Sequence, residues 1–143
     1  MIRDYQEKDL DIVVDIWLEA SIIAHSFIPK NYWEEKRKDM RDVYIPSAKT
    51  YVYEDDDSGN VLGFVSLVDN YIAALFVSPA YQGKGIGTKL INYVKQSHNC
   101  LILGVYVENN DSVLFYKKQG FTILEEKTEE HTGHKEYVMQ FLR

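Results

Sequence analysis

Cysteine is almost absent from this sequence, because Cys100 is the only one among the 143 residues. A single cysteine excludes an intramolecular disulfide and any zinc site built from several thiolates. No run of about 18 apolar residues, the length needed to span a membrane, occurs either. The first eleven residues, MIRDYQEKDLD, are charged where a secretory signal requires an apolar centre. From these absences we expect a cytoplasmic protein with no membrane partner.

Basic residues are also in the minority, with 16 Lys and Arg against 22 Asp and Glu, for a net charge of −6. Contacts to a phosphate backbone require a basic surface, so we expect no nucleic-acid partner. An acidic surface is compatible with a cationic substrate. Hydrophobic residues make up 45 % of the chain, enough for the core of one domain over residues 1–143.

The hydrophobic pattern changes period along the chain and predicts alternating helices and strands. Helical spacing predicts one helix with Asp9 as its N-cap, another after Pro29, and two more over 85–98 and 111–120. Strands are expected at 2–5, 100–107, 121–129 and 135–142, with three consecutive antiparallel strands between 49 and 78. Turn residues at 57–60 and 69–70 separate those three strands.

The order of these elements predicts the fold class. A strand, a helix and the next strand, from 71 to 107, form a βαβ unit whose two strands should be parallel. The unbroken apolar run CLILGVYV predicts a strand buried on both faces. We therefore expect an α/β (α+β mixed) domain with a twisted, mixed, mostly antiparallel sheet of about six to seven strands, flanked by about four helices.

The segment SPAYQGKGIGTKL, residues 78–90, places three glycines on alternate positions directly before a helix. The N-terminus of a helix presents free backbone N–H groups, and its dipole favours negative charge. Gly83, Gly85 and Gly87 would let an anion approach the backbone closely, and Lys84 adds a positive charge. The pattern predicts a phosphate-binding loop.

Three phosphate ligands can be compared by their glycine spacing. The Walker A spacing G-x-x-x-x-G-K-[ST] is absent, so nucleoside triphosphate hydrolysis is disfavoured. The dinucleotide fingerprint G-x-G-x-x-G would require glycine where Thr88 stands, although Glu108 lies where a ribose-binding acid could be. That interpretation, an NAD-binding oxidoreductase, is weakened but stays open. The pyrophosphate of coenzyme A is the third ligand.

At this loop the sequence resembles the GCN5-related N-acetyltransferase (GNAT) family. Residues 82–87 spell its Q-x-x-G-x-G signature, in the context ALFVSPAYQGKGIG. The family's downstream pattern N-x-x-[SA]-x-x-F-Y-x-x-x-G-F is matched by six residues: Asn109, Ser112, Phe115, Tyr116, Gly120 and Phe121. The resemblance implies transfer of an acetyl group from acetyl-CoA directly to a primary amine, of a small molecule or of a peptide or protein.

The resemblance also implies the residues that contact acetyl-CoA. The pantetheine arm would pair with the strand at 75–77, and the N–H of Phe76 or Val77 would face the thioester carbonyl, where such a donor stabilises the transition state. An ordinary buried strand would explain these residues equally well. The expected cofactor-binding set is Leu75, Phe76, Val77, Gln82, Gly83, Lys84, Gly85, Ile86, Gly87, Thr88, Asn109, Ser112 and Tyr116.

Tyr116 is the expected catalytic residue on the same grounds. A phenol, with an ordinary pKa near 10, is protonated at neutral pH and can give its proton to the leaving thiolate, whose ordinary pKa is near 8.5. Without the motif, a packed tyrosine would be the preferred interpretation, since the chain has 11 tyrosines. Asn109 could likewise be only a helix cap.

No residue is marked as the base that deprotonates the amine. Removing a proton from a lysine-like amine at pH 7 costs about 4–5 kcal/mol, so a base or a water relay is expected. Many family members carry a glutamate on the fourth strand, but this chain reads YIAA at 71–74. Asp69, Glu108 and His25 are nearby candidates, and each could instead be structural. Cys100 has no evident histidine partner, so a covalent intermediate is disfavoured.

The segment SIIAHSFIPKNYW resembles a group of small bacterial acetyltransferases with A-H-x-F-I-P at this place. In the family the first two helices wall the acceptor pocket, which implies that His25, Phe27 and Trp33, together with Asp69, bind the acceptor. The family contains monomers and homodimers, and both stay open. A non-catalytic acyl-CoA-binding sensor on the same fold remains the alternative function.

Overall fold

The computed structural model describes all residues from 1 to 143, and its element order is the predicted one. The sheet has seven strands in the order β1-β2-β3-β4-β5-β7-β6. The strands are β1 (Ile2–Asp4), β2 (Lys49–Glu54), β3 (Val61–Val68), β4 (Tyr71–Val77), β5 (Cys100–Tyr106), β6 (Thr122–Thr128) and β7 (Lys135–Leu142). Only the β4–β5 pair is parallel, so the expected mixed, mostly antiparallel sheet is confirmed.

Helices cover both faces of this sheet. The main helices are α1 (Leu10–Ala24), α2 (Lys30–Asp39), α4 (Ile86–Lys95) and α5 (Asn110–Lys118). Shorter helical segments are η1 (Glu7–Asp9), η2 (Met40–Tyr44), α3 (Ile45–Ser47) and η3 (Pro79–Tyr81). One core lies between the sheet and α1–α2, around Trp17 and Phe64, and the other lies under α4–α5, around Leu90 and Leu101. No helix is both long and apolar enough to cross a membrane.

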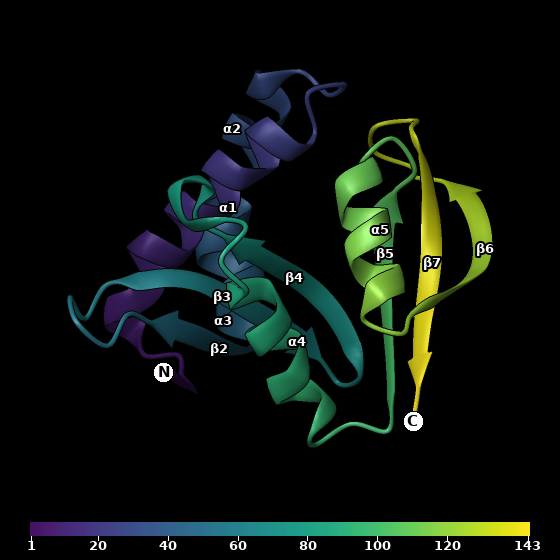
Figure 1. Ribbon diagram of the computed structural model, residues 1–143. Helices are drawn as coiled ribbons and strands as arrows, with labels where there is room; N and C mark the ends of the chain where they lie inside the picture. The colour runs from purple at the N-terminus through teal and green to yellow at the C-terminus, as the bar shows by residue number, and fades with distance from the viewer.

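The β4–β5 pair holds together over only part of its length. Tyr71 pairs with Ile102 and Ile72 with Leu103, and no pair follows. Beyond Ile72 the two strands separate, so that β1–β4 with α4 and β5–β7 with α5 form two groups (Figure 1). This separation leaves one edge of β4 without a strand partner in the middle of the sheet.

Two local predictions need correction. Asp9 is the N-cap residue of α1, as expected, but its side chain accepts no hydrogen bond from that helix. Its carboxylate instead accepts two hydrogen bonds from the Arg3 guanidinium, at 2.8 and 3.0 Å, and one from the Gln6 N–H, because η1 continues directly into the helix. The strand at 100–106 is buried on one face only: Leu101, Leu103 and Val105 are covered, and the residues between them are not. The α1–α2 layer packs mainly on β2, β3 and β4 and meets β5 at Tyr106, so the other residues on that face of β5 are not fully buried.

Candidate active site

The glycine loop after β4 adopts a left-handed conformation that its glycines allow. Gly83 has φ +78° and Gly85 has φ +83°, in the left-handed region that side chains disfavour. Gly85 is the N-cap of α4, and the first turn of that helix carries no acidic residue. A Cβ at either position would meet no atom within 4 Å, so the backbone lies open on that side. The loop fits a pyrophosphate held by backbone N–H groups at a helix N-terminus.

Gly87 has a different role from the other two glycines. A Cβ at this position would lie 3.3 Å from Cζ of Phe115, on α5. Gly87 therefore allows α4 and α5 to pack closely where the two strand groups separate. The sequence pattern alone did not distinguish this packing role from a phosphate-binding role.

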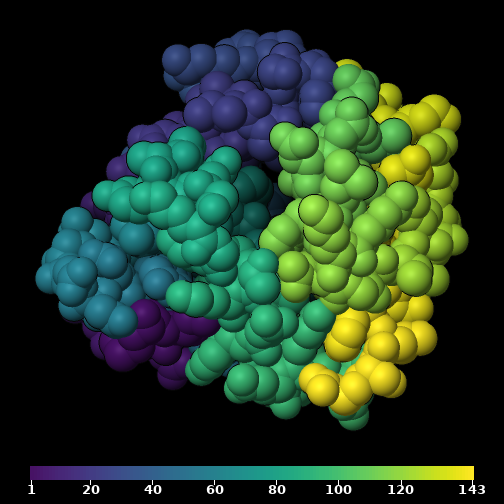
Figure 2. Space-filling view, in the orientation of Figure 1, coloured from purple at the N-terminus to yellow at the C-terminus, as the bar shows by residue number.

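A cavity of about 940 Å³ lies between the loop, the free edge of β4 and α5. The space-filling view shows the surface hollowed between the teal atoms of the loop and α4 and the green atoms of α5 (Figure 2). Twelve of the thirteen residues expected to contact the cofactor line it: Leu75, Phe76, Val77, Gln82, Gly83, Gly85, Ile86, Gly87, Thr88, Asn109, Ser112 and Tyr116. Lys84 is the exception, and its Nζ lies 5.3 Å above the ring of Tyr81.

Tyr116 and Asn109 come from opposite ends of α5. The Asn109 side chain caps that helix, and its Oδ1 accepts a hydrogen bond from the Ser112 N–H at 3.4 Å. Tyr116 is buried on the cavity wall, and burial raises its pKa further above that of an ordinary phenol. The hydroxyl therefore stays protonated at neutral pH, which is the form that a proton donor needs.

The aromatic residues expected on the acceptor side form a cluster at the end of α1. The His25 ring lies 5.0 Å from Trp33 and 5.9 Å from Phe27, between ring centroids. It also lies 5.2 Å from Tyr106 on β5, and its Nε2 is 3.4 Å from Nδ2 of Asn109. His25 therefore connects the α1–α2 layer to the N-terminus of α5, and burial lowers its pKa to about 4.

The remaining candidates for the amine base do not join this cluster. Asp69 lies exposed in the β3–β4 turn with φ +55°, outside the cavity wall. Glu108 lies at the cavity edge, where its Oε1 is 3.1 Å from Nδ1 of His134. Cys100 contacts the amides of Asn70 and Gln140 and no histidine.

Sequence reasoning missed two groups of residues near the opening between β4 and β5. Ala20, Ile23, Ala24 and Ser26, from the end of α1, line the cavity. No signal in an ordinary amphipathic helix marks them. Glu136 on β7, whose carboxylate lies beside Gly104 and the Tyr71 hydroxyl, was not singled out either.

Comparison with known proteins supports the resemblance seen in the sequence. The model of the family described as Acetyltransferase (GNAT) domain matches residues 46–123. The peptidyl-lysine N-acetyltransferase YiaC of Escherichia coli K12 is 37 % identical over 99 % of this chain and 96 % of its own length.

Two solved structures share the fold over nearly the whole chain. The solution structure of apo YjaB from Escherichia coli has a TM-score of 0.87 at 24 % identity, covering 99 % of this chain and 96 % of its own. PaiA N-acetyltransferase from Thermoplasma acidophilum, solved in complex with coenzyme A, has a TM-score of 0.81 at 18 % identity, covering 100 % and 98 %.

Proposed function

Because the chain belongs to the GNAT family and is an acetyl-CoA-dependent N-acetyltransferase, we propose that its acceptor is a lysine side chain of a peptide or protein. The lysine acceptor is supported by YiaC, whose name describes that activity and which matches almost the whole chain. The family assignment replaces the NAD-dependent alternative. We further propose that residues 1–143 act as one N-acetyltransferase domain.

The observation that carries the proposal is the cavity between the free edge of β4 and the N-terminus of α4. The backbone of Gly83 and Gly85 at the helix N-terminus would hold the pyrophosphate. The unpaired edge of β4 beyond Ile72 can hydrogen-bond an extended pantetheine arm as a further strand would. Acetyl-CoA supplies the activated acetyl group, as a thioester.

Tyr116 is proposed to protonate the leaving thiolate. It lies on α5, on the cavity wall, and its raised pKa keeps the proton in place until sulfur develops charge. Asn109 and Ser112 would contact the cofactor arm from the first turn of the same helix.

His25, Phe27 and Trp33 are proposed to wall the acceptor side. Their rings pack together next to Tyr106, and the Phe27 ring lies 5.6 Å from that tyrosine. None of the three residues lines the cavity itself, so they are proposed to border an acceptor path beside it. Aromatic rings suit the apolar stem of a lysine whose charged end reaches the thioester. A contact of Asp69 with the acceptor stays a prediction, as does the choice between monomer and homodimer.

The test is acetylation of a peptide that contains one lysine and has a blocked N-terminus. We expect release of free thiol from acetyl-CoA and a gain of one acetyl group on the lysine, detected by mass spectrometry. The matched control is the same peptide with arginine in place of lysine. Acetylation only of small polyamines, or only of a free N-terminus, would contradict the lysine assignment. Tight acetyl-CoA binding without thiol release from any amine would favour the non-catalytic alternative.

A further inference from the structure

A glutamate and a tyrosine converge where β4 and β5 begin to separate. Tyr71 is the first residue of β4 and pairs with Ile102 of β5. Glu136 is the first residue of β7 that pairs with β5, where it lies opposite Tyr106. Both side chains reach over Gly104 of β5. A Cβ built on Gly104 would lie 3.1 Å from Oε2 of Glu136 and 3.3 Å from the Tyr71 hydroxyl oxygen. The missing side chain of Gly104 therefore leaves space into which both polar groups point.

This pair lies on the face of the sheet opposite the one that carries Tyr116. Alternation along β5 puts Gly104 on the same face as Tyr106, whose ring contacts His25. Tyr116 instead packs with Leu103 and the other covered residues under α4 and α5. Tyr116 and Glu136 therefore lie on opposite faces of the sheet, and Glu136 is not among the residues that line the cavity. An acceptor that reaches Glu136 must approach from the face of Tyr106 and His25.

We propose that Glu136 is the general base that takes the proton from the acceptor ammonium group, with the Tyr71 hydroxyl as a second polar contact for that group. The proposal rests on the lysine acetyltransferase function proposed above. It assigns the role that a glutamate on the fourth strand cannot fill in this chain, because residues 71–74 contain no acid.

The neighbours of Glu136 leave its carboxylate available. Its side chain is 19 % exposed, and its ion-pair partner is Lys127 of β6, with Nζ at 3.7 Å from Oε1. That lysine is more than half exposed, so the pair is weak. The other charged or titratable groups that act on this region are Glu129, Tyr71 and Tyr106. Burial and the charge of Glu129 raise the pKa of Glu136, against the opposing effect of Lys127.

The other nearby carboxylates are occupied. Both oxygens of Glu129 accept hydrogen bonds from the β6–β7 turn, from the N–H groups of His131 and Thr132, and these lower its pKa. Glu108 is bound to His134. The raised pKa of Glu136 makes it a stronger base than Glu129, whose pKa is lowered, since basicity increases with the pKa of the conjugate acid.

The acceptor ammonium gives one proton to the Glu136 carboxylate, and the freed nitrogen lone pair forms a C–N bond to the thioester carbonyl carbon. The C–S bond then breaks, and its electron pair leaves on sulfur. Tyr116 protonates the thiolate and regains a proton from the nitrogen as the amide forms. Glu136 releases its proton to solvent, so the products are the acetylated amine, the free thiol and one proton.

The first test is the variant Glu136→Gln, which keeps the shape and removes the base. We expect kcat to fall roughly 100-fold at pH 7, with unchanged affinity for acetyl-CoA, because general-base catalysis is worth about 10²–10⁴-fold. The deficit should shrink as the pH approaches the pKa of the free amine, near 10.4, where no base is needed. The acidic limb of the pH profile of kcat/KM should be absent from the variant.

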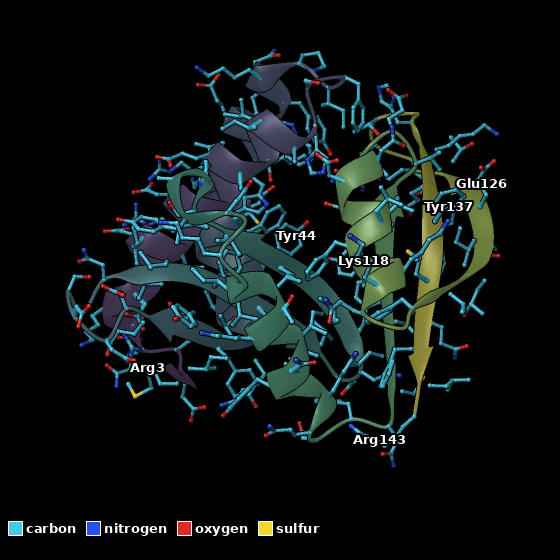
Figure 3. The ribbon with its side chains drawn as sticks, viewed as in Figure 1. Arg3, Tyr44, Lys118, Glu126, Tyr137 and Arg143 are labelled. Atoms are coloured by element: carbon cyan, nitrogen blue, oxygen red, sulfur yellow. The ribbon has the colours of Figure 1, made fainter.

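The matched control is Glu126→Gln, which removes one carboxylate from the neighbouring strand. Figure 3 shows Glu126 on the outer strand β6, at the edge of the molecule. It is exposed, and its partner is Lys135 at 3.6 Å. We expect this variant to keep the turnover and the pH profile of the wild type.

A second variant, Gly104→Ala, tests the position of the Glu136 carboxylate without replacing Glu136 itself. Its Cβ would displace the ends of Glu136 and Tyr71, so kcat should fall several-fold while acetyl-CoA still binds. The proposal is overturned if Glu136→Gln keeps wild-type turnover and pH dependence, or if it fails to fold and Gly104→Ala keeps wild-type turnover. Absence of lysine acetylation by the wild type would instead refute the proposed function itself.

Discussion

The glycine loop can be tested by comparing two glycines with the same backbone geometry. Gly85 in the loop and Gly59 in the β2–β3 turn have φ values of +83° and +75°, and a Cβ at either meets no atom within 4 Å. The cost of alanine at both positions is therefore backbone strain without a clash. A non-glycine residue in the left-handed region costs about 1–2 kcal/mol. For a domain of this size such a loss lowers the Tm by about 3–8 °C.

The two variants should differ only in acetyl-CoA binding. Gly85→Ala places a methyl group at the N-terminus of α4, where the phosphates would accept hydrogen bonds from the backbone. Loss of one hydrogen bond to a charged group costs about 1.5–3 kcal/mol, so the Kd should rise roughly 10- to 100-fold. Gly59→Ala should bind with wild-type affinity. Isothermal titration calorimetry gives the affinities, and thermal denaturation gives the Tm values.

Two results would refute this reasoning. Wild-type affinity in Gly85→Ala, with the same Tm loss as in Gly59→Ala, would mean that the loop does not hold the phosphates. An unchanged Tm in both variants would mean that the left-handed conformation costs nothing at these glycines.

Three further predictions concern the proton donor, the buried histidine and the ion pair beneath α1. Tyr116→Phe should keep its affinity for acetyl-CoA but lose about 100-fold or more in kcat at pH 7 in a thiol-release assay; unchanged turnover would remove Tyr116 from the acid role. The folded-state pKa of His25, about 4, lies below that of an unfolded histidine. Between pH 6.5 and 4 the unfolded state therefore binds more protons than the folded state, so the free energy of unfolding falls as the pH is lowered. The His25 contribution between pH 7 and pH 5 is about 2 kcal/mol, and urea unfolding at the two pH values should show a smaller loss for His25→Gln than for the wild type. Arg3→Met leaves the buried Asp9 carboxylate without its partner and should lower the free energy of unfolding by about 3–5 kcal/mol, and a loss below 1 kcal/mol would contradict that account.

Much of the fold could be predicted from the sequence because the patterns that indicate each element lie within that element. The alternation between 49 and 78, the glycines at 83–87 and the turn at 69–70 each act on their own segment of backbone. Asp9 shows the limit of such reading. A carboxylate before a helix is typical of an N-cap, but Arg3 on β1 binds it more strongly than a helix N–H would.

Apart from Lys84, the residues expected to contact the cofactor lie together along one cavity, whereas none of the four residues expected to bind the acceptor lines that cavity. The loop, β4 and the start of α5 lie within one stretch of about 40 residues, and their motifs carry the resemblance. The proposed base site collects Tyr71, Gly104 and Glu136 from three strands, and none of these residues belongs to a local motif.

By itself, the sequence indicated the glycine loop before α4, since glycine adopts the left-handed conformation that other residues disfavour. It also determined the element order and, through Tyr116 and Asn109, the expected chemistry. Only the tertiary structure decided where β4 and β5 part, and therefore which side chains face each other across the opening. Strand register is set by packing between distant segments, so the position of Glu136 over Gly104 could not be known before the sheet was assembled.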